Sequence, residues 1–243
     1  CVEVCPQHAL KLTREGIVTD PQLCVLCGKC VEACPTLAME MSGTEYPIEY
    51  LMEQIRKEIP VMDGSGGGVT FCGGEPLMHA DYLMELLDRC GELSLHRAVD
   101  TTLLAKPDVI RQVMSKCELL LVDLKLMDSE KHRYYCGVPN ELILSNIRMV
   151  SEAGMRFFIR IPLIEGVNAD EENITRSADF LASLPKKPDV VNLLPYHDIG
   201  KNKHEKLGTI YNPKHIPMAA PSPEWQQRCV EIFRERGVKA EIG

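Results

Sequence analysis

The chain has 243 residues, 45% of them hydrophobic, which is enough to bury a large core. Its formal net charge of −8 gives no basic surface for a nucleic acid, and no apolar run approaches the roughly 20 residues that cross a bilayer. Eleven cysteines indicate a reducing compartment in which thiolates persist as metal ligands. We therefore expect a cytoplasmic protein without nucleic-acid or membrane partners.

The first element in the chain is a cysteine-rich segment. It opens with CVEVCPQH, in which Cys1 stands four residues before Cys5 and a proline follows. A longer run, CVLCGKCVEACP, has the same C-x3-C-P ending and two further cysteines before it. Its cysteines are Cys24, Cys27, Cys30 and Cys34. The spacing C-x2-C-x2-C-x3-C-P is that of bacterial ferredoxins, which bind [4Fe–4S] clusters.

The two runs together predict how the cysteines divide between clusters. In two-cluster ferredoxins the fourth cysteine of each run binds the other cluster. We therefore expect one complete cluster, with the ligands Cys5, Cys24, Cys27 and Cys30. Cys1 and Cys34 would serve a second cluster whose other ligands lie upstream, so we expect the sequence to be N-terminally incomplete. Zinc sites usually come as separated C-x2-C pairs and disulfide-rich domains are short, so both alternatives fit less well.

From Pro47 onward, helical patterns alternate with short β-branched or apolar runs, which is typical of βα units around a parallel sheet. The expected strands are 69–72, 98–100, 119–124, 157–161, 190–194 and 239–242. The expected helices are 48–58, 81–90, 107–116, 141–153, 171–184 and 224–236. We expect two domains, a ferredoxin-like module at 1–43 and an α/β domain at 44–243.

Glycines flank the first expected strand in DGSGGGVTFCGGEP. This stretch lacks the G-K-[ST] of a Walker loop, and Val69 stands where a dinucleotide motif needs its last glycine. We expect residues 64–68 to form a flexible loop before the strand. Gly73 and Gly74 would let backbone groups approach a ligand, and Glu75 would add an acceptor for a ligand ammonium group. A tight strand-to-helix turn would explain the same residues.

Other polar segments end or follow the later strands, namely DTT, DLK, RIP and PYHD. Active sites of α/β barrels lie at the carboxyl ends of the strands, so we expect these segments to meet on one rim.

Four successive blocks carry a family resemblance: VTFCGGEPL, VDLKLMDSEKHRYYCGVPNELILSNI, IRIPLIEGVNADEENI and LLPYHDIGKNKHEKLG. They resemble the glycyl radical enzyme activating enzymes of the radical S-adenosylmethionine superfamily, over nearly the whole chain. The resemblance implies a partial (β/α)6 barrel of the TIM type, here lacking its first strand, with an inserted ferredoxin-like [4Fe–4S] module. It also implies that S-adenosylmethionine binds across the strand ends.

The resemblance assigns a role to the residues after the first strand. Gly73, Gly74 and Glu75 match the motif whose backbone holds the methionine amino group. Cys72 stands where the family usually has serine, and we expect it to be a small core residue at the strand end. DTTLLA also lacks the glycine that often follows the family's aspartate.

Five further residues gain roles from the resemblance. Asp123 and Lys125 match a D-x-K pair at the ribose and carboxylate end of the ligand. Arg160 resembles the arginine that neutralises the methionine carboxylate, a role that suits a planar bidentate donor. His197 resembles the residue beside the adenosine, and Asp100 matches an acidic position near the active site. Each could instead be a rim residue that satisfies local backbone groups.

The family's reactive cluster is held by C-x3-C-x2-C, which this chain lacks. Cys1 and Cys5 would need a cysteine at position 8, where His8 stands, and Cys30 and Cys34 would need one at position 37. We expect the motif upstream of residue 1 and assign no catalytic residue within the chain.

The implied function is activation of a partner glycyl radical enzyme. An electron enters through the ferredoxin clusters, S-adenosylmethionine is cleaved, and a 5′-deoxyadenosyl radical takes a hydrogen atom from a glycine of the partner. The implied cofactors are S-adenosylmethionine and up to three [4Fe–4S] clusters. A flavodoxin or ferredoxin would be the reductant, and the protein would be a monomer.

Three alternatives compete with this function, and one of them keeps the radical chemistry but changes its target. One is a ferredoxin-type electron-transfer protein on an inactive barrel. Another is a radical maturase of a different peptide, but maturases with C-terminal clusters need more cysteines than the single Cys229 that follows Cys136. The third, a metal phosphohydrolase at His197 and Asp198, lacks other histidines in register. The blocks do not distinguish among activating enzymes for different partners.

Overall fold

The computed structural model describes residues 1–41, 43–200, 204, 211–212 and 214–243. The chain forms two compact units. The first unit comprises Cys1–Tyr46 and Asp198–Ile216, and the second unit comprises Pro47–His197 and Pro217–Gly243. Grouping of the late segment 198–216 with the first unit was not expected from the sequence pattern.

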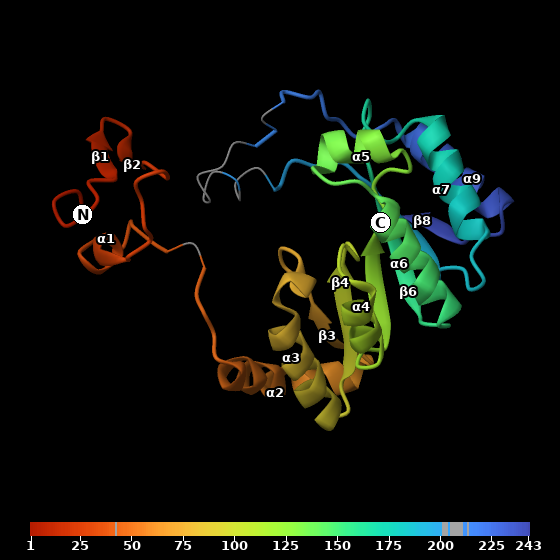
Figure 1. The fold of residues 1–243 in the computed structure, drawn as a ribbon, viewed down its shortest axis with the longest axis horizontal. Coiled ribbons are helices and arrows are strands. Elements are labelled where there is room, and N and C mark those ends of the chain that lie inside the picture. Colours follow the sequence, from red (N-terminus) through yellow and green to blue (C-terminus); the bar gives the residue numbers. More distant parts are fainter. Residues whose placement is uncertain (42, 201–203, 205–210, 213) are drawn as a thin grey trace. The chain divides into compact units, whose positions relative to one another are not determined.

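The first unit contains short elements. β1 (Leu10–Thr13) and β2 (Gly16–Thr19) form an antiparallel hairpin, which the sequence did not predict, and α1 (Lys29–Glu32) is about one turn long (Figure 1). Among its described residues, the buried apolar ones are Ala9, Leu10 and Cys34. So small a core does not offset the entropy of ordering the chain, so this unit needs another source of stability.

The second unit is built on a six-stranded sheet with the strand order β3-β4-β5-β6-β7-β8. Its strands are β3 (Gly68–Phe71), β4 (His96–Thr101), β5 (Leu119–Asp123), β6 (Phe157–Leu163), β7 (Val190–Pro195) and β8 (Ala240–Ile242). All neighbours pair in parallel. The predicted α/β class with a parallel sheet is therefore confirmed.

Helices alternate with these strands. They are α2 (Ile48–Ser65), η1 (Pro76–His79), α3 (Ala80–Glu92), α4 (Pro107–Met114), α5 (Ser129–Cys136), α6 (Glu141–Glu152), α7 (Glu171–Ala182) and α9 (Pro223–Glu235). η1 and α5 were not among the expected elements. No helix in the described part of the chain is long and apolar enough to span a membrane.

The expectation of a flexible loop at 64–68 is wrong. α2 continues through Pro60 to Ser65, and β3 begins at Gly68. The reason is packing: Ile55, Ile59 and Met62 follow one another at helical spacing and contact a small buried cluster beneath the helix. Packing of this apolar face stabilises the helix beyond residue 58, where the sequence pattern predicted its end.

Strand register separates an apolar face of the sheet from a polar one. Ile159 and Ile161 are fully buried on the face that packs against the helices. Side chains alternate along a strand, so Arg160 lies on the opposite face. It pairs in register with Asp123 of β5 and Asn192 of β7. The polar face therefore carries charged and amide side chains near the carboxyl ends of its central strands.

Candidate functional site

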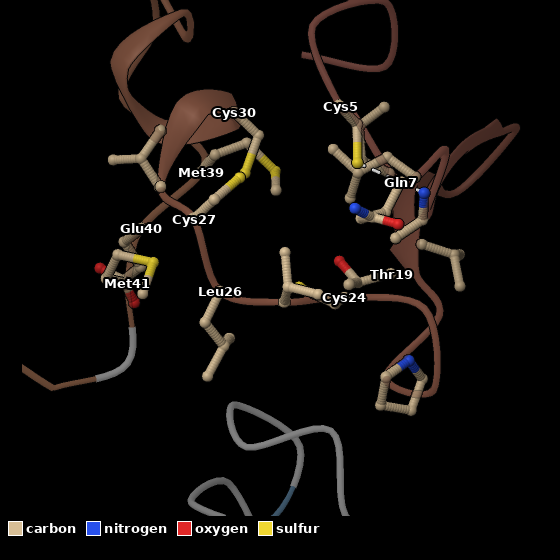
Figure 2. A pocket seen from close by; sticks show the side chains of 18 residues that line it. Cys5, Gln7, Thr19, Cys24, Leu26, Cys27, Cys30, Met39, Glu40 and Met41 are labelled. Atoms are coloured by element: carbon tan, nitrogen blue, oxygen red, sulfur yellow. Dashed lines mark hydrogen bonds between the residues drawn. The ribbon is translucent and has the colours of Figure 1, made fainter.

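Four cysteines of the first unit line one cavity of about 690 Å³, which we call the cysteine cavity (Figure 2). Cys5 comes from the loop before β1, Cys24 and Cys27 come from the segment that leads into α1, and Cys30 lies in the first turn of α1. These are the four residues that the two cysteine runs assign to one cluster. In the described part of the chain, no three His, Cys, Asp or Glu side chains lie close enough to hold a metal ion. The four cysteines thus line one cavity, but no three of them are close enough together to form a metal site.

The lining of the cysteine cavity suits an iron–sulfur cluster. Many of its other residues are apolar, including Ile17, Val25 and Val31. The backbone N–H of Ala9 donates a hydrogen bond to Cys5 Sγ at 3.3 Å. Hydrogen bonds to sulfur and apolar surroundings both tune the potential of such clusters. The donor set and its environment therefore fit a [4Fe–4S] cluster.

Cys1 and Cys34 are not among the residues that line this cavity. Cys34 is buried, and its Sγ lies 3.6 Å from Thr36 Oγ1. The hydrogen bond with Thr36, aided by backbone groups of Met39 and Ala38, lowers the pKa of the Cys34 thiol to about 7. A thiolate is the form that binds a metal, so Cys34 is suited to be a ligand. Its assignment to a second cluster stays a prediction.

In the second unit, the loop after β3 exposes its backbone. Gly73 has φ 96° and Gly74 has φ 49°, conformations that favour glycine. No heavy atom lies within 4 Å of the position that a Cβ would take at either residue. A ligand can therefore approach these two peptide groups without meeting a side chain, which fits the binding of an amino-acid end.

Glu75 is hydrogen-bonded within the chain. Its Oε1 accepts from Thr101 Oγ1 at 2.6 Å and from the Leu77 N–H at 3.2 Å. Its Oε2 accepts from the Thr102 N–H at 2.8 Å and from Thr102 Oγ1 at 2.6 Å. Neither threonine was singled out from the sequence, although DTT was recognised as a polar strand end. Glu75 thus joins the loop after β3 to the end of β4.

Arg160 connects the ends of three strands. Its Nε and Nη2 donate to Asp123 Oδ1 at 3.2 and 2.8 Å, and Nη2 also donates to Asp100. Lys125 Nζ lies 3.6 Å from Asp123 Oδ2. Burial raises the pKa of the Asp100 carboxyl, and the nearby Arg160 opposes that rise. Four predicted residues, Asp100, Asp123, Lys125 and Arg160, therefore form one group of charges, which we call the Arg160 network.

Asn192 extends the polar face beyond the residues predicted from the sequence. It lies beside Arg160 in register, and its Nδ2 donates to Glu241 Oε1 of β8 at 3.0 Å. A single amide in the otherwise apolar run VVNLLP was the signal that could have identified it.

Two predictions at the strand ends have different outcomes. Cys72 is exposed, so its expected place in the core is wrong, because it follows the last residue of β3, Phe71, and lies outside the packed sheet. His197 is also exposed and is the last residue of its segment of the second unit. No hydrogen bond among the described residues joins His197 to the Arg160 network, so its place beside the adenosine stays a prediction.

Comparisons with known proteins identify the family of this chain. The family model of the radical SAM superfamily matches residues 25–178, and that of a 4Fe-4S dicluster domain matches residues 1–38. The trans-4-hydroxy-L-proline dehydratase activating enzyme of Clostridioides difficile is 35% identical over 246 residues, covering 100% of this chain and 80% of the relative. The 4-hydroxyphenylacetate decarboxylase activating enzyme of Clostridium scatologenes is 34% identical over 248 residues, covering 100% of this chain and 78% of the relative.

A solved structure shares the fold at higher identity. A domain of the pyruvate-formate lyase-activating enzyme from Bacteroides vulgatus ATCC 8482 is 56% identical, with a TM-score of 0.63. The match covers 73% of this chain and 99% of that one. Together with the superfamily match over more than half of the chain, these relatives place the protein in a family. This chain belongs to the glycyl radical enzyme activating enzymes of the radical SAM superfamily.

Proposed function

We propose that this protein activates a partner glycyl radical enzyme by removing a hydrogen atom from one of the partner's glycines. When bound, [4Fe–4S] clusters and S-adenosylmethionine supply the electron and the 5′-deoxyadenosyl radical for this reaction. The observation that carries the proposal is the open Gly73–Gly74 backbone at the same sheet edge as the Arg160 network, in a chain of this family.

The two units divide the work in this proposal. Residues 1–43 are a ferredoxin-like module in which Cys5, Cys24, Cys27 and Cys30 hold one [4Fe–4S] cluster, and Cys1 and Cys34 serve another. Residues 44–243 are a partial (β/α)6 barrel that binds S-adenosylmethionine. The cysteine cavity and the match to a 4Fe-4S dicluster domain support the first assignment, and the six parallel strands support the second.

The methionine end of the ligand lies against Gly73, Gly74 and Arg160 in this proposal. The exposed glycine peptides offer hydrogen-bonding groups to the amino group. Arg160 uses Nε and Nη2 for Asp123 and Asp100, and the described residues provide no acceptor for its Nη1. Nη1 is therefore available for the methionine carboxylate, while the two aspartates hold the guanidinium in one orientation.

The remaining predicted residues act further along the ligand. Asp123 and Lys125 bind the ribose and carboxylate end, and His197 contacts the adenosine. Asp100 orients Arg160 from the neighbouring strand, an arrangement that the hydrogen bond between them supports.

The partner is a glycyl radical enzyme, and we infer a flavodoxin or ferredoxin as the electron donor. We also infer a monomer in the cytoplasm. The net charge of −8 disfavours a nucleic-acid partner. Among relatives, the names identify a hydroxyproline dehydratase and a hydroxyphenylacetate decarboxylase as the enzymes that are activated. Both are candidate partner classes for a first test.

The test uses the full-length gene product, purified without oxygen, reconstituted with iron and sulfide, and reduced. We expect 5′-deoxyadenosine from S-adenosylmethionine, measured by chromatography, and a glycyl radical signal on a candidate partner, measured by electron paramagnetic resonance. Arg160→Lys should abolish most of the product. The matched control is Arg156→Lys, because Arg156 is exposed and pairs with Asp189 at 2.9 Å, outside the Arg160 network. Fully reconstituted, reduced protein that forms no 5′-deoxyadenosine would contradict the proposal.

A further inference from the structure

We propose that Thr102 is a positioning residue, which holds the Glu75 carboxylate in place and thereby fixes the Gly73–Gly74 backbone for the ligand's amino group. This inference rests on the proposed function, because it concerns how the Gly73–Gly74 backbone is prepared for S-adenosylmethionine. It differs from the simpler expectation that the Glu75 carboxylate accepts a hydrogen bond from the ammonium group.

The acceptor capacity of Glu75 is the first argument. An ionised carboxylate offers about four lone-pair sites on its two oxygens. Four donors of the chain already occupy them: Thr101 Oγ1, the Leu77 N–H, the Thr102 N–H and Thr102 Oγ1. An ammonium group could bind the carboxylate only by displacing one of these donors. The open peptide groups of Gly73 and Gly74 are therefore the better acceptors.

The rigidity of the segment that supplies three of these donors is the second argument. Thr101 Oγ1 also accepts from the Leu103 N–H at 3.0 Å, and Thr102 Oγ1 accepts from the Leu104 N–H at 3.3 Å. Leu103 has φ 56° while its side chain is almost fully buried, a backbone conformation that leucine rarely adopts. Strained residues of this kind persist only where the surroundings over-determine them, and they cluster at functional sites.

The third argument is the anchor beneath this segment. Asn146 of α6 is buried, and its Nδ2 donates to Leu103 O at 2.9 Å and to Ala105 O at 3.0 Å. The turn after β4 is thus tied to the core on one side and to Glu75 on the other. It can transmit the rigidity of the core to a loop that contains two glycines.

The consequence for binding is preorganisation. Gly74 is bonded directly to Glu75, and glycine loses more conformational freedom on ordering than any other residue. Fixing Glu75 before the ligand arrives removes part of that entropic cost from the binding step. Thr102 acts through Glu75 and touches no ligand atom.

The test compares Thr102→Val, which removes only the hydroxyl donor, with Thr102→Ser, which keeps it. The control is Thr175→Val, an equivalent change at a half-buried position of α7. Without ligand, amide hydrogen exchange measures the Leu77 and residue 102 amides, which both donate to Glu75. We expect about five- to tenfold faster exchange at these amides in Thr102→Val, as for the loss of one hydrogen bond, and wild-type rates in the other two variants.

Titration calorimetry with S-adenosylmethionine on the reconstituted full-length protein then tests the role in binding. We expect the dissociation constant to rise about five- to tenfold in Thr102→Val and to equal the wild-type value in Thr102→Ser. If Glu75 were the ligand for the amino group, freeing one acceptor site would leave the affinity unchanged or increase it, and that result would overturn the inference. Wild-type protein that binds no S-adenosylmethionine would instead overturn the proposed function, and the inference with it.

Discussion

Among the described residues of the first unit, the buried apolar ones are Ala9, Leu10 and Cys34, whereas the second unit buries a continuous core that includes Phe157, Ile159 and Phe233. The first unit instead contains the six cysteines with ferredoxin spacing. Hydrophobic burial accounts for the order of the second unit. In the first unit hydrophobic burial is too small to stabilise the fold. We therefore expect metal–thiolate bonds to supply the stability, as in other small metal-binding domains. The comparison predicts different responses of the two units to the same treatments.

The largest expected effect is that of iron removal. Anaerobic chelation should unfold the first unit and leave the second folded, because a buried apolar core stabilises the second unit and the first has almost none. Hydrogen exchange should show complete loss of protection in peptides from residues 5–34 and no change in peptides from β5 and β6. Protection that survives in residues 5–34 after the iron has been removed would show that the first unit does not depend on metal–thiolate bonds for its stability.

The next largest difference expected between the two units is in the rate at which their cysteines are alkylated. In iron-free protein at pH 8, iodoacetamide should label Cys24 and Cys27 within minutes but not Cys117 or Cys229. Burial raises the pKa of Cys117 to about 12 and that of Cys229 to about 11, so both remain neutral thiols at this pH. For Cys117 the thiolate fraction is about a thousandfold below that of an ordinary thiol.

Peptide mass spectrometry measures this labelling. In guanidinium chloride all eleven cysteines should be labelled, which is the control for the reagent. Labelling of Cys117 in native protein at the rate of Cys24 would show that the core of the second unit opens together with the first.

Truncation of a core side chain should affect the second unit alone. Ile159 is fully buried, so Ile159→Ala is expected to lower the free energy of unfolding of this unit by about 3 kcal/mol. Leu12→Ala is the control in the first unit, because Leu12 is 70% exposed and its loss should change little. Urea unfolding followed by circular dichroism measures both, with iron content assayed in parallel. Loss of iron from Ile159→Ala at equal urea concentration would indicate that the two units unfold together.

The smallest effect concerns the pH dependence of the second unit. Burial raises the pKa of Asp100 above its ordinary value of 3.8. At a pH between the ordinary and the raised value, the folded state therefore keeps a proton that the unfolded state has released. The contribution of Asp100 to stability is therefore highest at acid pH and declines as the pH rises from that ordinary value through the raised one. Asp100→Asn removes this dependence.

The variant should thus gain stability relative to wild type as the pH rises above the ordinary pKa of 3.8, as measured by the urea midpoint. Asp108→Asn, at an exposed position of α4, controls for the loss of one negative charge. A relative stability of Asp100→Asn that falls over this pH range would show that pairing with Arg160 outweighs burial.

Much of the architecture could be predicted from local patterns. The alternation of helices and short apolar strands after Pro47 predicted the parallel sheet, because the periods of 3.6 and 2 are set by backbone geometry within one element. The cysteine spacing predicted iron–sulfur chemistry for a similar reason, since the ligand spacing is a property of one short loop. Helix α2 was predicted too short, because packing beneath Ile59 and Met62 extends it.

The site depended on contacts that no local pattern contains. Glu75 and Thr102 are 27 residues apart, and Arg160 and Asp100 are 60 apart, yet each pair is hydrogen-bonded. Strand register sets these partners, and register follows from which faces of all the strands are buried together. The residue types at the strand ends could thus be read directly from the chain. Their hydrogen-bonded pairing could be seen only in the folded sheet.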